Sequence, residues 1–187
     1  MKYKFTLFFL LLTIGSLGFS QTRPEREHRI KKSQFPSIEV GLVPKEAKNL
    51  KYYQEVDTPK TTYILKFRLK KMKYHMDMDE LGQIGQLGFE VKELDIPQET
   101  YTQISDFLEG NFQKIKIKRI LQYYPGDSDN AVKNAFQNLI LPSNTYELLF
   151  KGKRSNGNKE YTATFDAEGN ILKLREALPA NFDRVLY

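Results

Sequence analysis

The sequence predicts an α+β fold built from two copies of one unit, and three observations lead to this prediction. The pattern Y-x-x-x-[MF]-D-x-x-G-x-I occurs at residues 74–84 and again at residues 161–171. Around both copies, apolar and polar residues alternate with the period of two that is typical of strands with one solvent-exposed face. Segments with the apolar spacing of helices fill the gaps between these strands.

Several strands are predicted from the period-two alternation. A Y-x-x-x-F motif also recurs upstream of both copies of the repeated pattern, which supports a duplication. In residues 111–124, three lysines alternate with isoleucines, which favours a strand there as well. The other predicted strands cover residues 63–69, 74–78, 161–165 and 171–176.

Each D-x-x-G element predicts a tight turn that closes a hairpin. Asp79 and Asp166 stand at the first position of the turn, and Gly82 and Gly169 stand at the fourth. These residue types suit a type I turn in which the glycine accepts a positive φ. If the two copies are structurally equivalent, both glycines adopt positive φ at the ends of matching hairpins.

Helices are predicted between the strands. Residues 97–110 begin with Pro97, carry apolar residues on one face and end at Gly110. Residues 129–138 begin with an aspartate that can cap a helix, and apolar residues at helical spacing follow it. Residues 44–54 are a shorter candidate helix.

The first 20 residues have the features of a secretory signal peptide. Lys2 and Lys4 precede an almost wholly apolar run at residues 5–14, and the small residues Gly18 and Ser20 suit cleavage after position 20. The apolar run is shorter than the roughly 18–20 residues that cross a bilayer, so no transmembrane segment is expected after cleavage. Because the chain has no cysteine, a lipoprotein is excluded. We therefore expect export to the periplasm or the extracellular space.

A basic flexible tail and linker are expected over residues 21–42. Residues 21–34 carry five Lys or Arg against two Glu and have one apolar side chain, Ile30, so we expect this stretch to stay solvated. An alternative is that the tail contacts an anionic surface. The formal net charge of the chain is +6, but the expected export argues against a nucleic-acid partner.

The composition and motifs exclude several classes of site. The chain has no Cys and only two His, which excludes a disulfide scaffold, a thiol nucleophile and a cysteine-ligated metal site. The sequence contains no glycine-rich nucleotide-binding motif, zinc-protease motif or serine-hydrolase motif. We therefore expect no cofactor and no enzymatic activity.

The order of hairpin, F-D-x-x-G-x-I motif, strand and [IL]-P resembles the secreted PepSY-like proteins and the tandem repeats of β-lactamase-inhibitory proteins. The motif stands at residues 165–171, and the [IL]-P pairs stand at 96–97 and 178–179. The resemblance implies two side-by-side repeats, residues 43–112 and 113–187, with helices packed on one face of an antiparallel sheet. It also implies a non-catalytic module that binds or restrains other proteins outside the cytoplasm.

Two predicted strands carry basic residues at alternating positions, and these form the candidate partner-binding surface. If the two strands share one sheet face, an acidic partner can dock on it. Tyr123 is a further candidate contact, because tyrosine makes a good interface anchor. The alternative is that the lysines only keep the face soluble and protect strand edges. The basic residues are Lys66, Arg68, Lys114, Lys116 and Lys118.

His75, Asp77 and Asp79 project from one face of a predicted strand, about 7 Å apart along the chain. Such a row could ligate a metal ion. The second copy, however, has two threonines and Asp166 at these positions, and Asp79 is expected to be used by its turn. A solvent-exposed strand face is therefore the favoured interpretation.

The favoured function is an exported non-catalytic binding or regulatory module. Its sheet face or hairpin tips would contact another extracytoplasmic protein. Two alternatives stay open: a metal-dependent enzyme centred on His75, Asp77 and Asp79, and a structural envelope protein whose basic tail lies on an anionic surface. The sequence does not specify the partner or the oligomeric state.

Overall fold

The described chain forms one antiparallel sheet in which each strand pairs with its neighbours in sequence, in the order β1-β2-β3-β4-β5-β6-β7-β8-β9. The computed structural model describes residues 26–37, 42–57, 60–126, 130–155 and 157–177. The expected signal peptide, residues 1–20, lies outside the described residues. The strands are β1 (Arg26–Ile30), β2 (Lys48–Asp57), β3 (Lys60–Leu69), β4 (Met72–Met78), β5 (Ile84–Val91), β6 (Ile115–Pro125), β7 (Thr145–Arg154), β8 (Gly157–Phe165) and β9 (Ile171–Glu176).

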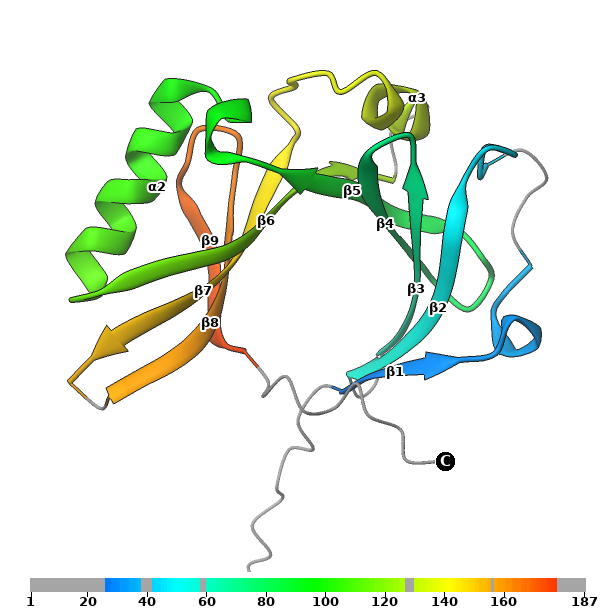
Figure 1. Ribbon diagram of the computed structural model, residues 1–187, viewed down its shortest axis with the longest axis horizontal. Helices are drawn as coiled ribbons and strands as arrows, with labels where there is room; N and C mark the ends of the chain where they lie inside the picture. The colour runs from blue at the N-terminus through cyan, green and yellow to red at the C-terminus, as the bar shows by residue number, and fades with distance from the viewer. Residues whose placement is uncertain (1–25, 38–41, 58–59, 127–129, 156, 178–187) are drawn as a thin grey trace, which may run out of the picture.

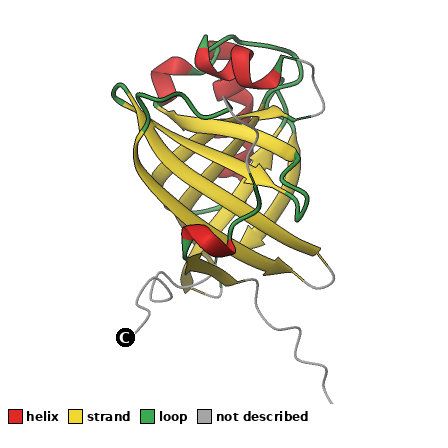
Figure 2. Cartoon of the chain, turned by 90° about the vertical axis from the view of Figure 1, so that its right-hand side faces the viewer, coloured by secondary structure: helices red, strands yellow, loops and turns green. Residues whose placement is uncertain are grey.

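The sheet curves into an arc, and the helices lie on its outer, convex side (Figure 1). Figure 2 shows the sheet turned by 90°, where neighbouring strands form one continuous wall. No helix among the described residues is long and apolar enough to cross a membrane. The helical segments are η1 (Lys32–Gln34), η2 (Glu93–Asp95), α2 (Gln98–Asn111) and α3 (Ala131–Phe136).

The structure corrects the expected α+β fold of two repeats with helices packed on one sheet face. The described residues form mostly one sheet, and α2 is their only helix of seven or more residues. The helix expected over residues 44–54 is absent, because β2 occupies most of this stretch and pairs with β1 on one side and β3 on the other. Pairing on both sides satisfies the backbone of β2 and outweighs the weak local helical pattern. The described part of the helix expected over 129–138 is helical only in α3.

Other elements follow the sequence pattern. The helix expected over residues 97–110 is confirmed as α2, and the strand expected within 111–124 is confirmed as β6. The strands expected from apolar alternation lie within β3, β4, β8 and β9. Alternation predicts these strands because the sheet buries one face along most of its width.

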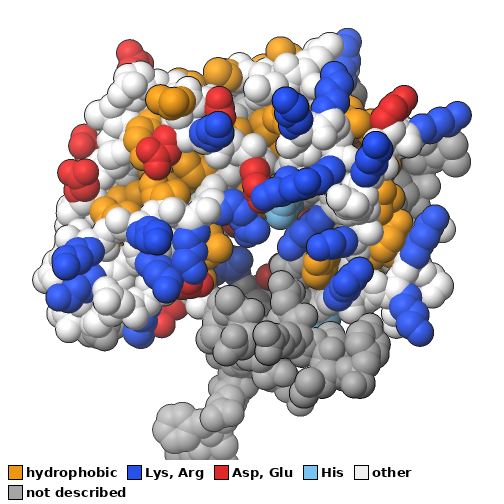
Figure 3. Space-filling model, in the orientation of Figure 1, with side chains coloured by type: hydrophobic (Ala, Val, Ile, Leu, Met, Phe, Trp, Pro, Cys, Tyr) orange, Lys and Arg blue, Asp and Glu red, His pale blue; other side chains and the backbone are white. Residues whose placement is uncertain are grey.

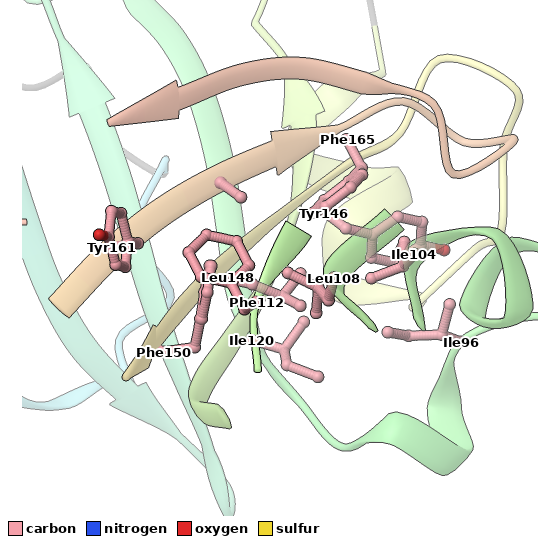
Figure 4. Packing of buried hydrophobic residues seen from close by; sticks show 11 residues of the cluster. Ile96, Ile104, Leu108, Phe112, Ile120, Tyr146, Leu148, Phe150, Tyr161 and Phe165 are labelled. Carbon is pink, nitrogen blue, oxygen red and sulfur yellow. The ribbon is translucent and has the colours of Figure 1, made fainter. Parts of the chain in front are cut away.

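One apolar cluster fills the space between α2 and the second half of the sheet (Figure 4). Ile104 and Leu108 project from α2 into this cluster. Phe112, directly after the helix, packs edge-on against Phe150 and Tyr161, with ring centroids 5.0 and 4.9 Å away. The other buried sheet residues of the cluster are Ile120, Tyr146, Leu148, Ala163 and Phe165.

A second apolar cluster covers the convex side of the first half of the sheet. Tyr74 lies at its centre and contacts Phe67 and Phe136 of α3, with ring centroids 5.3 Å away in each case. Phe35, which follows η1, packs edge-on against Tyr52 at 5.1 Å. Both clusters therefore lie on the convex side, and the opposite side of the sheet is left without a described helix.

The two D-x-x-G turns have the same geometry, which confirms their expected equivalence. Gly82 and Gly169 have φ angles of 79° and 91°. In each turn, Oδ1 of Asp79 or Asp166 accepts hydrogen bonds from the backbone N–H groups two and four residues later, at 2.8–3.1 Å. A register shift precedes each turn in the β4–β5 and β8–β9 hairpins. The two hairpins therefore share their irregularities as well as their sequence motif.

Part of the stretch expected to be a solvated tail, residues 21–42, forms regular structure, whereas residues 21–25 and 38–41 lie outside the described residues. Arg26–Ile30 form β1, whose five residues all pair with β2. Phe35 is only 9% exposed and belongs to the second apolar cluster. An edge strand gains its hydrogen bonds from the backbone of one neighbour, so a basic segment with one apolar residue can form it.

η1 and η2 share a second repeated sequence pattern, which was not among the predictions. Residues 31–36 (KKSQFP) and 92–97 (KELDIP) share the pattern K-x-x-[QD]-[FI]-P. Lys31 N donates to Gln34 Oε1 at 2.9 Å, and Lys92 N donates to Asp95 Oδ2 at 2.8 Å. The apolar residue before each proline is buried. Strand β1 therefore corresponds to β5, since each leads into this turn on the convex side.

A side chain added at Gly82 or Gly169 is expected to destabilise the protein. A Cβ on either glycine would lie 2.5 Å from a backbone carbonyl oxygen, that of Ser37 or Thr100, and both glycines have positive φ. Gly82→Val and Gly169→Val should each lower the free energy of unfolding in urea by more than about 1 kcal/mol. Gly157→Val is the matched control, because Gly157 has a φ of 104° but an added Cβ would meet nothing within 4 Å. Equal losses at all three positions would contradict the steric part of this explanation.

Candidate functional site

The inner side of the curved sheet, opposite the helices, is the candidate site, and we call it the concave face. Side chains alternate along a strand, so the residues between the buried core residues of β2–β9 point to this face. Figure 3 looks into the arc in the orientation of Figure 1, and side chains fill the space that the ribbon leaves open. Lys and Arg side chains are prominent around its centre (Figure 3).

The centre of the concave face carries an excess of cations over carboxylates, arranged in two groups. The first basic cluster, on β2–β4, consists of Lys51, Lys66, Arg68 and Lys73. The second basic cluster, on β6–β9, consists of Lys116, Lys118, Arg119, Lys151, Lys173 and Arg175. The carboxylates in the same central region are Glu55, Asp77, Glu90, Glu147 and Glu160.

The structure brings most of the sequence-derived partner-binding residues to one face. Lys66 and Arg68 of the first cluster and Lys116 of the second lie on the concave face. Lys118, at a register shift in β6, reaches the same face, where it pairs with Glu160. Lys114 precedes β6 at the margin of the sheet, where its backbone carbonyl accepts the N–H of Lys153. Tyr123 lies on the concave face as well, directly opposite Gly88 of β5.

The floor of the concave face is buried although no described helix covers it. Ile64, Leu121 and Tyr123 are each less than 9% exposed. An added Cβ on Gly88 would lie 2.4 Å from Cδ1 of Tyr123, so the tyrosine ring lies against the glycine backbone. Curvature brings side chains of neighbouring strands together on the inner side of a sheet, which explains their burial. The exposed cations therefore stand on a closely packed floor.

Cation–π contact orders part of the first basic cluster. Lys66 Nζ lies 4.4 Å from the ring centroid of Tyr53, within the range of a favourable interaction. Tyr53 itself is buried on the floor. The contact fixes the position of the ammonium group, which reduces the conformational entropy that Lys66 would lose on binding a ligand.

His75 lies at the centre of the concave face and is only 6% exposed. It pairs across the sheet with Lys66 on one side and Gly88 on the other. Burial, and then the positive charges of Lys66, Arg119 and Lys73, lower the pKa of His75 from 6.5 to about 3. The imidazole is therefore neutral near pH 7, and its lowered pKa reflects its burial first and the surrounding positive charges second.

The residues of the alternative metal site do not assemble as ligands. Among the described residues, no three His, Asp or Glu side chains come together in a way that could hold a metal ion. Asp77 Oδ2 accepts a hydrogen bond from Gln86 Nε2 at 2.7 Å, and Asp79 Oδ1 is used by the D-x-x-G turn. The cations around His75 would also repel a metal ion.

Ion pairs between described residues join strands across the concave face. Lys73 Nζ lies 2.6 Å from Glu90 Oε2, and Lys118 pairs with Glu160. All four side chains stay partly exposed, so each pair contributes on the order of 0–1 kcal/mol to stability. These pairs neutralise part of the positive charge and leave the face with a surplus of cations.

Three members of the second basic cluster were not identified from the sequence: Lys151, Lys173 and Arg175. Lys151 alternates with buried Phe150, and Lys173 and Arg175 flank Leu174, which packs against the first apolar cluster. The alternation in β7 and β9 was a usable signal for their orientation. The sequence alone did not show that β6, β7 and β9 turn these residues to the same side.

Comparison with known proteins finds similarity to solved structures, among them two proteins from Bacteroides species. No protein family matches the sequence, and no curated protein matches it significantly. A DUF2874 family protein from Bacteroides ovatus is 13% identical with a TM-score of 0.46, covering 70% of this chain and 77% of that chain. A BLIP-like protein from Bacteroides fragilis is 10% identical with a TM-score of 0.45, covering 73% of this chain and 79% of that chain. At these scores we draw no conclusion on function from either protein, and the resemblance to PepSY-like proteins stays a prediction.

The pH dependence of stability is expected to report the environment of His75. In the unfolded chain this histidine gains a proton near its ordinary pKa of 6.5, whereas in the folded protein it stays neutral down to about pH 3. Acidification below 6.5 therefore favours the unfolded state, and stability falls as pH drops. Between about pH 7.5 and 5, the wild type should lose about 2 kcal/mol more stability than His75→Gln.

Urea melts across this pH range measure the difference. His28→Gln is the matched control, because the other histidine is exposed on β1 and its replacement should leave the wild-type slope unchanged. A wild-type slope in His75→Gln would show that the buried imidazole does not resist protonation.

Proposed function

We propose that this chain is an exported, non-catalytic module that binds another extracytoplasmic protein through its concave face. The observation that carries this proposal is that one face of the sheet is covered and the other is not. Helices and the segment after η1 cover the convex side, while the concave face presents exposed cations on a packed floor. A stable fold alone does not require a surplus of like charges in the middle of a sheet.

The chemistry of the concave face favours binding over catalysis. Its exposed groups are mainly lysine and arginine side chains, which attract an anionic surface and accelerate its association. His75 is neutral, buried and surrounded by cations, so it is poorly placed to exchange protons with a substrate. Tyr53 and Tyr123 supply an aromatic floor for contact.

Export is supported by the first 20 residues, which carry the charged start, apolar run and small residues of a secretory signal. An exported chain meets its partner in the periplasm or the extracellular space. A protein partner from that compartment is therefore the one that the experiment should seek.

Charge reversal on the concave face is expected to abolish partner capture. The purified protein is immobilised and exposed to an extracytoplasmic fraction, and retained proteins are quantified. The concave variant should retain at least about tenfold less partner than the wild type. It carries Arg68→Glu, Lys116→Glu and Lys151→Glu.

A control variant carries three Lys→Glu changes away from the concave face, so its net charge changes by the same amount. It should retain as much partner as the wild type. Thermal melts check that both variants fold. Equal capture by the two variants would exclude the concave face as the binding site, and substrate turnover lost only in the concave variant would contradict a non-catalytic role. The control variant carries Lys45→Glu, Lys92→Glu and Lys133→Glu, at positions that are exposed in the described structure.

A further inference from the structure

We infer that the segment bound by the concave face is an extended acidic stretch of the partner polypeptide, whose carboxylates lie on the two basic clusters. This inference rests on the proposed function and adds the chemistry of the partner. Three features carry it: cations placed directly opposite one another, their position on interior strands, and carboxylates interspersed among the cations.

At three places in the sheet, two cations lie directly opposite each other on adjacent strands. Lys51 lies opposite Lys66, and Arg68 lies opposite Lys73. In the second cluster, Lys116 lies opposite Lys151. Like charges directly opposite each other repel across a sheet. For Arg68 and Lys73, the ion pair of Lys73 with Glu90 offsets part of this repulsion. Anionic groups placed between the opposed cations would relieve this repulsion.

The position of these pairs argues against a role in solubility or edge protection alone. Lysines that discourage aggregation are needed on edge strands, which have unpaired backbone groups. The opposed cations lie on β2, β3, β4, β6 and β7, and each of these strands is paired on both sides. Sites where a local rule of stability is broken are commonly functional.

The distribution of carboxylates favours a polypeptide over a uniform polyanion. Glu90 on β5 and Glu147 on β7 lie between the first basic cluster and Lys173 on β9. A polyphosphate or sulfated polysaccharide that bridges the clusters would carry negative charge over these glutamates. A peptide with neutral residues between its acidic ones can place carboxylates on the cations and avoid the glutamates, which is the complementarity expected of a specific partner.

His75 provides an internal reporter of such binding. The cations facing it are Lys66 from β3, Lys73 from β4 and Arg119 from β6. Burial lowers the pKa of His75 most, and these cations lower it further. Asp77 on β4 and Glu90 on β5 are the nearby carboxylates on the same face. Carboxylates bound on the basic clusters would offset the cations, so ligand binding should raise the pKa of His75 and move its ring signals in NMR spectra.

The test uses a peptide of about 12 residues with Glu at alternate positions and Ser between them, which extends over roughly 40 Å. Calorimetry measures its affinity, and NMR follows the ring of His75. The probe variant removes one cation from each opposed pair, and it should bind the peptide about tenfold more weakly than the wild type. The probe variant carries Lys51→Gln, Arg68→Gln and Lys151→Gln.

The same variant should be at least as stable as the wild type in urea, because one charge of each repelling pair is gone. A purely structural role for these cations predicts the opposite, a loss of stability. The control variant should match the wild type in peptide affinity. It carries Lys45→Gln, Lys92→Gln and Lys133→Gln.

Three results would overturn the inference. The first is equal peptide affinity in the probe and control variants. The second is peptide binding with no movement of the His75 signals. The third is binding of inorganic polyphosphate or heparin as tightly as the peptide. Partner capture that depends on the concave face, together with any of these results, would leave the proposed function standing while this inference falls.

Discussion

Burial of only one side of a curved sheet is the constraint on which the rest of the structure depends. Each strand from β2 to β9 must place apolar side chains on the convex side, where α2, α3 and Phe35 cover them. Since side chains alternate along a strand, every other residue is then directed into the hollow of the sheet. The strand register that places apolar residues in the core therefore also determines which residues lie on the concave face.

This constraint explains which elements the sequence could predict. The hairpins ending at Gly82 and Gly169 were recognisable because Asp, Gly and alternating apolar residues all specify the same local structure. α2 was recognisable from its own apolar face and its flanking residues. In contrast, β1 and β2 are strands because they pair with each other and with β3, and this interaction is not visible in their own residues.

The candidate site was predictable in part for the same reason. Alternation indicated that Lys66 and Arg68 share a face, and that Lys116 shares one with other lysines of its strand. Which faces meet depends on strand order and register, so the contribution of Lys151 and Lys173 became visible only in the folded chain. His75 was considered as a metal ligand, but the cations that neighbouring strands bring around it give it a different environment.

The central claim is that a partner docks on the concave face and not on the helix-covered side, and site-specific crosslinking tests it most directly. The chain has no cysteine, so a single introduced cysteine can be labelled uniquely with a photoactivatable crosslinker. Thr162→Cys places the label on the concave face beside Arg175, and Glu109→Cys places it on the outer surface of α2. With an extracytoplasmic fraction, the account predicts one specific crosslinked protein from position 162 and none from position 109. A specific crosslink from position 109 alone would contradict it.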